Sequence, residues 1–153
     1  HGGDSAAMSI AVKTGDGRIF VEAIDCRPQR AGNVWILDFL EKADVDSVVV
    51  DGASGQELLA SDMKRRKLKA PKLPTVSNSV FSQAVAMKTL CHMGQPSVVQ
   101  IVSNCEKRAI GSNGGYGFKS ILDGAKVELM DSMILAHWLC GSKKEHKKQK
   151  ISY

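Results

Sequence analysis

Hydrophobic and polar residues alternate through positions 7–13 and again through 18–25, which is the pattern of strands with one buried face. The segment between them, Thr14-Gly15-Asp16-Gly17, is a typical turn sequence. The two alternating stretches therefore predict a β-hairpin at the start of the chain.

Apolar residues at helical spacing predict several helices after this hairpin. The expected ranges are 33–42, 54 or 55 to about 67, 77 or 79 to about 92, about 97–107, and 127–139. We expect Asn33 to cap the first helix, and Pro71 and Pro74 to end the second. The glycine-rich segment 111–117 is expected to form a flexible turn between short extended pieces.

Residues 47–50 form a continuous run rich in β-branched side chains, which predicts a central strand buried on both faces. A further short strand is expected at 73–76. This order of elements predicts an α/β fold whose mixed sheet begins antiparallel, continues parallel and is flanked by helices. We expect one domain over residues 1–142, followed by a basic tail at 143–153.

The composition, 43% hydrophobic and 24% charged residues, is that of a globular protein, and its apolar runs are far shorter than the roughly 20 residues that cross a bilayer. We therefore expect no membrane association. The four scattered cysteines lack zinc-ligand spacing and are expected to be reduced thiols in or near the core, in a reducing cytoplasm. The start has neither an initiator methionine nor a signal peptide, so we expect a fragment of a longer protein.

The net charge of +5 favours polyanionic partners, because each Lys or Arg placed at a phosphate releases a condensed counterion. Short charged runs are also commonly solvated faces, so charge alone leaves both interpretations open. The candidate DNA-binding residues come from two basic segments: Lys64, Arg65, Arg66, Lys107 and Arg108. The second segment, with the glycines after it, forms either a loop that contacts the DNA backbone or a hairpin whose aromatic residues close the core.

Three carboxylates are candidates for chemistry. Asp51 directly follows the expected central strand, at the sheet end where α/β proteins place their sites, although Asp-Gly after a strand is also a common turn. Asp131 lies within an apolar helix, where a buried carboxylate needs a partner such as a metal ion; alternatively it belongs to a polar stripe with Glu128. Asp4 can approach the same sheet end, or it can simply belong to a flexible terminus.

Carboxylates that converge from distant parts of a chain suit hard cations, and we expect a two-ion site for Mg²⁺ or Mn²⁺ at Asp4, Asp51 and Asp131. Two such ions can support phosphodiester hydrolysis. The sequence contains no GxxxxGK[ST] phosphate loop, GxSxG elbow or HExxH motif, so the corresponding chemistries have no support.

Three segments together resemble the C-terminal nuclease domain of phage terminase large subunits: VVVDGASGQ (48–56), EKRAIGSNGGYGF (106–118) and LMDSMILAHW (129–138). The hairpin with DGRIFVEAI (16–24) and the helix around Trp35 follow the same order of elements. The similarity covers most of the chain.

The resemblance implies an RNase H-like fold and two-metal endonucleolytic cutting of concatemeric double-stranded viral DNA during genome packaging. Asp51 matches the family's central-strand aspartate and Asp131 its late-helix aspartate, while Asp4 is the acidic residue available for the first position. The implied partners are DNA, an N-terminal ATPase domain of the same polypeptide, the portal and the small terminase subunit, in the host cytoplasm.

Two alternatives remain beside this hypothesis. The chain can be a DNA-binding or assembly module of the packaging motor without competent chemistry, which would bind DNA in a salt-dependent way and ignore metal. It can also be another RNase H-like nuclease, such as a resolvase, which would prefer branched DNA.

Overall fold

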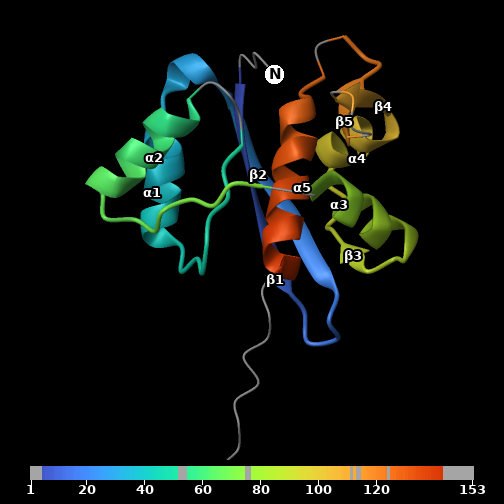
Figure 1. Ribbon diagram of the computed structural model, residues 1–153, viewed down its shortest axis with the longest axis horizontal. Coiled ribbons are helices and arrows are strands. Elements are labelled where there is room, and N and C mark those ends of the chain that lie inside the picture. The colour runs from blue at the N-terminus through green and yellow to red at the C-terminus, as the bar shows by residue number, and fades with distance from the viewer. Residues whose placement is uncertain are drawn as a thin grey trace, which may run out of the picture.

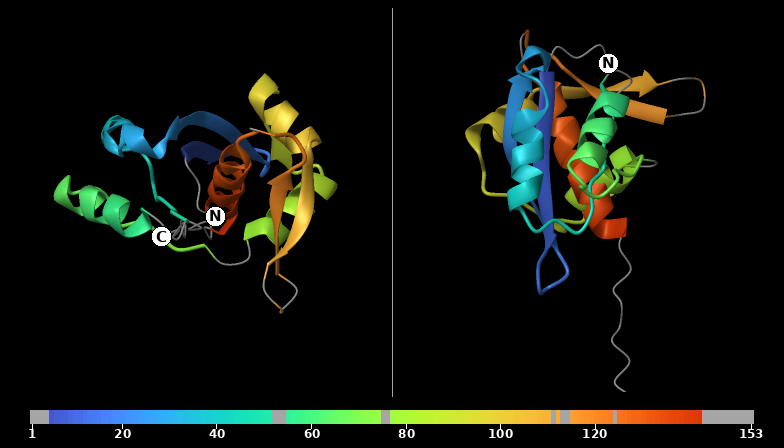
Figure 2. Two further views of the ribbon diagram at one scale, coloured as in Figure 1. Left: turned by 90° about the horizontal axis from the view of Figure 1, so that it is seen from above. Right: turned by 90° about the vertical axis from the view of Figure 1, so that its left-hand side faces the viewer.

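The computed structural model describes residues 5–51, 55–74, 77–110, 112, 115–123 and 125–142, so Asp4 and the expected basic tail lie outside the described residues. The fold is α/β, with a three-stranded mixed sheet between helices on both of its faces (Figures 1 and 2). No helix within the described residues is long and apolar enough to cross a membrane.

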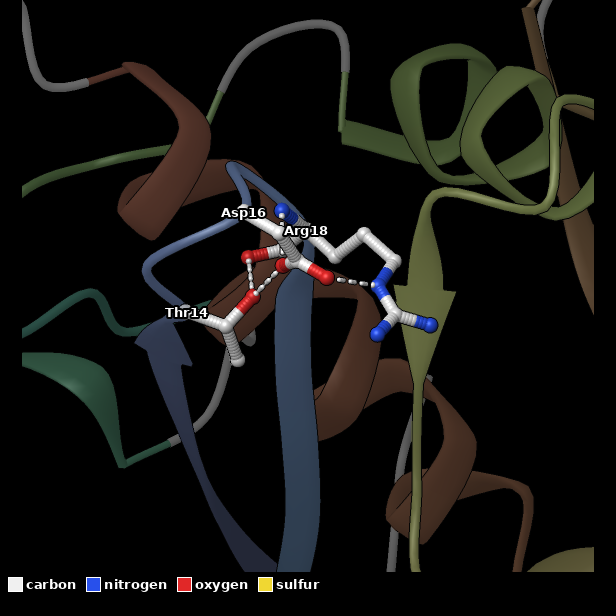
Figure 3. Close-up of polar contacts among 3 residues, drawn as sticks. All are labelled: Thr14, Asp16 and Arg18. Atoms are coloured by element: carbon white, nitrogen blue, oxygen red, sulfur yellow. Dashed lines mark hydrogen bonds and ion pairs between the residues drawn. The ribbon is translucent and has the colours of Figure 1, made fainter.

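Strands β1 (Ser5–Lys13) and β2 (Ile19–Pro28) form the expected antiparallel hairpin. In its turn, the Thr14 hydroxyl donates to the Asp16 carboxylate, and Arg18 Nε lies 2.7 Å from Asp16 Oδ2 (Figure 3). These hydrogen bonds, that of Thr14 first, lower the pKa of Asp16 to about 2. The turn is therefore stabilised by contacts among residues that are close in the sequence.

A short third strand, β3 (Leu90–Cys91), pairs in parallel with the start of β2, which gives the order β1-β2-β3. Farther along β2 a side chain takes the place of a strand. The Gln95 amide donates to the Ala23 carbonyl and accepts from the Ala23 N–H, both at 3.0 Å. A sheet that begins antiparallel and continues parallel is thus confirmed, although its parallel part is two residues long.

Helix α5 (Val127–Ser142) lies across β1 and β2, and α3 (Ser77–Ala86) and α4 (Pro96–Ser103) pack against it. These elements enclose the main core, whose buried residues are Ile19, Val21, Ala23, Phe81, Val98, Ile101, Leu129, Met130, Met133 and Ile134. The strongly apolar helix predicted from the sequence is therefore the central helix of the fold.

Helices α1 (Val34–Lys42) and α2 (Gln56–Arg65) cover the opposite face of the sheet, around a second core. Its buried residues are Ile36, Leu37, Leu40 and Met63. Met8 of β1 packs against this core, while Ala7 packs against the main core, as the alternation of side chains along a strand requires. β1 therefore contributes to both cores.

Asn33 immediately precedes α1, as expected, but its side chain makes no capping hydrogen bond. Its amide nitrogen instead donates to Asp62 Oδ2 at 3.1 Å. This contact joins the start of α1 to α2 because the two helices pack side by side, which the local sequence pattern does not reveal.

The prediction of a buried central strand at residues 47–50 is wrong. These residues are only partly buried, and Val49 alone forms a bridge, with Lys72. The Lys72 N–H donates to the Val48 carbonyl (2.8 Å), and the Val50 N–H donates to the Lys72 carbonyl (3.1 Å). The segment lacks a strand partner on its other edge within the described residues. The strand expected at 73–76 is likewise not formed at Leu73 and Pro74, and 75–76 lie outside the described residues.

Two helices end earlier than predicted. α3 ends at Ala86 because Lys88 adopts a positive φ of 55°, after which Thr89 leaves the helix and its carbonyl accepts from the Ile19 N–H (3.0 Å). α4 ends at Ser103, and the following residues form β4 (Cys105–Ile110), which pairs antiparallel with β5 (Gly115–Ser120). Strand pairing with distant residues overrides the helical pattern in both places. The four cysteines are thiols rather than disulfides, and they are partly buried.

Candidate active site

A cleft of about 1710 Å³ separates β1 from residues 44–51. Side chains of α1 and α5 line its two walls, and the β4–β5 hairpin reaches it through Arg108 and Phe118. The cleft therefore collects residues from elements that are widely separated in the sequence.

Asp51 and Asp131 both line this cleft, as the sequence analysis expected of converging carboxylates. Asp51 is exposed just beyond the Val49 bridge, and Asp131 is partly buried in the second turn of α5. The pKa of Asp131 is raised to about 6, first by burial and then by the negative charges of Asp51 and Glu128. The two aspartates are therefore close enough to interact electrostatically.

Glu128 is a third carboxylate of the cleft that the sequence analysis did not place in the site. It lies one helical turn before Asp131 on α5, and the i, i+3 spacing puts both residues on one helix face. That spacing was visible in the sequence, where it favoured a solvated polar stripe. The decisive fact is that this face of α5 borders the cleft.

Arg108 is the one DNA-binding candidate from β4 or β5 that lines the cleft within the described residues. Its positive charge opposes the rise in the pKa of Asp131. Gly117 on the paired strand leaves room for Ile110 rather than for Arg108, since a Cβ there would lie only 2.8 Å from Ile110 Cδ1 but at an ordinary 3.7 Å from Arg108 Nη2. Lys107 does not line the cleft; its Nζ lies 4.5 Å from the centroid of the Tyr116 ring.

The β4–β5 hairpin is held against α3 by Tyr116. The Tyr116 hydroxyl donates to Ser82 Oγ (2.9 Å), and the Asn78 amide donates to the Tyr116 carbonyl (2.9 Å). Tyr116 also packs edge-on against Phe118, at 5.8 Å between ring centroids. Of the two interpretations of this segment, the hairpin with packed aromatic residues describes its structure. The same hairpin also places the positively charged Arg108 at the cleft.

The basic group Lys64, Arg65 and Arg66 lies at the end of α2 and is not part of the lining of the cleft. Arg66 Nη1 lies 2.7 Å from Asp38 Oδ1 and 3.2 Å from Glu41 Oε2, and Arg65 pairs with Asp62. Arg66 thus joins the end of α2 to α1, whereas Arg65 pairs within α2. The structure does not bring them together with Arg108.

The carboxylates of the cleft have the right chemistry for a hard divalent cation, which prefers oxygen ligands. The repulsion that raises the pKa of Asp131 is the kind that a cation would relieve. Within the described ranges, however, no group of three or more His, Cys, Asp or Glu side chains is arranged to hold a metal ion. Asp4, the third ligand expected from the sequence, lies outside those ranges.

Comparison of the chain with protein-family models, with curated proteins and with solved structures finds no match.

Proposed function

We propose that this chain is a metal-dependent endonuclease that cuts double-stranded DNA. The observation that carries the proposal is the convergence of Asp51 and Asp131 in one cleft, where burial and then the charge of Asp51 raise the pKa of Asp131. Carboxylates that meet in one cleft are the arrangement that metal-dependent phosphodiester hydrolysis needs.

In this proposal Asp51 and Asp131 hold Mg²⁺ or Mn²⁺, with Glu128 or Asp4 as a further ligand. When bound, such ions supply an activated water and stabilise the leaving oxygen of the phosphodiester. Asp131 has to be ionised to serve as a ligand, so its raised pKa predicts activity that increases as the pH rises above about 6. Arg108 is positioned to bind a phosphate oxygen next to these carboxylates.

The wider setting follows from the resemblance of the three sequence segments to terminase nuclease domains. We propose an RNase H-like fold, cutting of concatemeric viral DNA in the host cytoplasm, and cooperation with an ATPase domain, a portal and a small terminase subunit. The observed mixed sheet with helices on both faces is compatible with that fold.

A DNA-binding module without chemistry is the second candidate. It is favoured by Arg108 in the lining of the cleft, because a cation there can bind a phosphate without any metal. Such a module would bind DNA through Arg108 and other cations and would be indifferent to divalent metal.

The test is the nicking and linearisation of supercoiled plasmid with Mg²⁺, Mn²⁺ or EDTA at pH 8. We expect cutting with either metal, none with EDTA, and a loss of at least about 100-fold in Asp51→Asn and Asp131→Asn, in line with removal of a metal ligand. Glu128→Gln tests whether Glu128 is a further metal ligand; if it is, this variant should cut less than the parent. A preference for four-way junctions over plasmid would favour a resolvase.

Asp123→Asn is the matched control, because Asp123 is exposed and does not line the cleft. It should cut like the parent chain. If the folded parent binds plasmid but leaves it uncut with both metals, the binding module replaces the nuclease as the conclusion.

A further inference from the structure

His137 is a buried titratable side chain that the proposed chemistry does not use. It lies on α5, and only 3% of it is exposed. Its ring packs at right angles against the ring of Phe81 from α3, with 5.5 Å between the two centroids. Its Nδ1 is fully buried and has no hydrogen-bond partner within the described residues. A group that changes its charge near neutral pH therefore lies in the contact between two helices of the main core.

The neutral ring of His137 fits this place better than the charged ring. A neutral imidazole has one N–H, and Nδ1, which finds no acceptor, is the nitrogen that can stay without a hydrogen. Protonation puts a second N–H at Nδ1 and a positive charge into apolar surroundings, where neither is compensated. Burial accordingly lowers the pKa of His137 from its ordinary value of 6.5.

Among the described residues, the elements packed against α5 supply no counter-ion for this charge. α3 and α4 contain no charged residue. The ionisable side chains of β1, β2, β5 and α5 are Lys13, Glu22, Asp25, Cys26, Arg27, Tyr116, Lys119, Glu128, Asp131 and Cys140. None of them shifts the pKa of His137, for which burial is the cause. A proton on His137 is therefore an uncompensated charge at the α3–α5 contact.

α3 connects His137 to the β4–β5 hairpin. Asn78, Phe81 and Ser82 are spaced i, i+3 and i+4, so they lie on one side of α3. Phe81 contacts His137. The other two residues form hydrogen bonds with Tyr116 of β5. α3 and β5 both pack against α5 (Figure 1). A shift of α3 away from His137 therefore also moves the residues that hold the hairpin.

We propose that His137 makes the contact between α3 and α5 sensitive to acid. Protonation of its ring loosens α3, and the β4–β5 hairpin loosens with it, whereas β1 and β2 stay paired. The neutral ring gives its full stabilisation above the unfolded-state pKa of about 6.5, and this stabilisation is lost as the pH falls below that value. The inference is independent of the nuclease proposal, because it concerns the packing of α3 and not the carboxylates of the cleft.

Amide hydrogen exchange at pH 7.5 and pH 5.0, corrected for the intrinsic exchange rates, measures the effect in the parent chain. We expect the protection of α3 and β5 to fall about tenfold at pH 5.0, because one pKa unit corresponds to a factor of ten, with a smaller change in β1 and β2. Unchanged protection of α3 would mean that the charge is tolerated. An equal loss in β1 and β2 would mean that acid unfolds the whole chain. Either result would overturn the proposal.

The variant His137→Gln, with His92→Gln as its matched control, assigns the effect to one ring. Because glutamine cannot be protonated, α3 of His137→Gln should lose little protection at pH 5.0. His92 is exposed, so His92→Gln should respond to acid like the parent. Asp131 titrates in the same range with the opposite effect on stability, but it is present in all three proteins and cancels in the comparison. An equal acid response in folded His137→Gln, or an NMR titration of the parent that places the pKa of His137 at or above its ordinary value, would contradict the proposal.

Discussion

The hydroxyl oxygens of Ser9 and Ser132 lie 2.6 Å apart and join β1 directly to α5, next to Asp131. Ser132 Oγ also donates to the Leu129 carbonyl at 2.8 Å, so its single hydrogen is used there and Ser9 is the donor to Ser132. β1 changes register between Met8 and Ser9, which is where this contact begins. The contact is one of those that hold α5 against β1 beside the cleft.

Removing this contact should destabilise the fold. We expect Ser132→Ala and Ser9→Ala each to lower the free energy of unfolding by about 1 kcal/mol, the usual contribution of a hydrogen bond. The double variant should lose less than the sum, since both remove the same bond. Urea denaturation of the four proteins measures this coupling, and strictly additive losses would show that the hydroxyls do not interact.

The pKa of Asp131 predicts an unusual dependence of stability on pH. The folded-state pKa of about 6 exceeds the ordinary 3.8, so the folded protein binds the proton more tightly than the unfolded chain. Stability should therefore fall as the pH rises from about 4 to about 6. Asp131→Asn removes this penalty and, in EDTA, should be more stable than the parent by up to about 3 kcal/mol at pH 8, with little difference at pH 4.

Urea unfolding between pH 4 and pH 8 checks this expectation. Asp123→Asn again serves as the control, and its stability should follow that of the parent across the range. If the free energies of unfolding of the parent and of Asp131→Asn change with pH in parallel, then Asp131 is ionised without cost and its pKa is not raised in the folded protein.

Two arginines from the predicted DNA-binding set should behave differently. Arg108→Gln should weaken DNA binding and reduce the slope of log K against log salt by about 1, as expected for the loss of one phosphate contact. Arg66→Gln should leave this slope unchanged, because its guanidinium is held by Asp38 and Glu41. It should instead cost at most about 1 kcal/mol of stability, the range of exposed ion pairs.

Salt titrations of DNA binding by fluorescence anisotropy, with urea denaturation of the same samples, separate these effects. An equal loss of slope in both variants would place DNA on the α1–α2 side of the molecule as well. If Arg108→Gln keeps the same slope of log K against log salt as the parent, Arg108 does not contact DNA.

Some elements were predicted correctly because their signals are local. The β1–β2 hairpin follows from alternation on both sides of a turn, and this turn is closed by Thr14, Asp16 and Arg18 themselves. The apolar helix at 127–139 follows from its length and composition, and α5 extends it to Ser142. Asp51 and Asp131 do line one cleft, but the reasoning that led there, a site at the end of a central strand, does not hold because that strand is not formed.

Other features depend on partners that are distant in the sequence. The run at residues 47–50 indicates a strand, but a strand becomes central only when both edges are paired, and the structure pairs one edge at Lys72. Lys88 ends α3 because the next residues hydrogen-bond with β2. Arg66 is held at α1, and Glu128 joins the cleft, through the packing of helices. The sequence by itself determined the local elements, whereas tertiary packing decided which strands pair and which charges meet, because these depend on contacts between residues far apart in the chain.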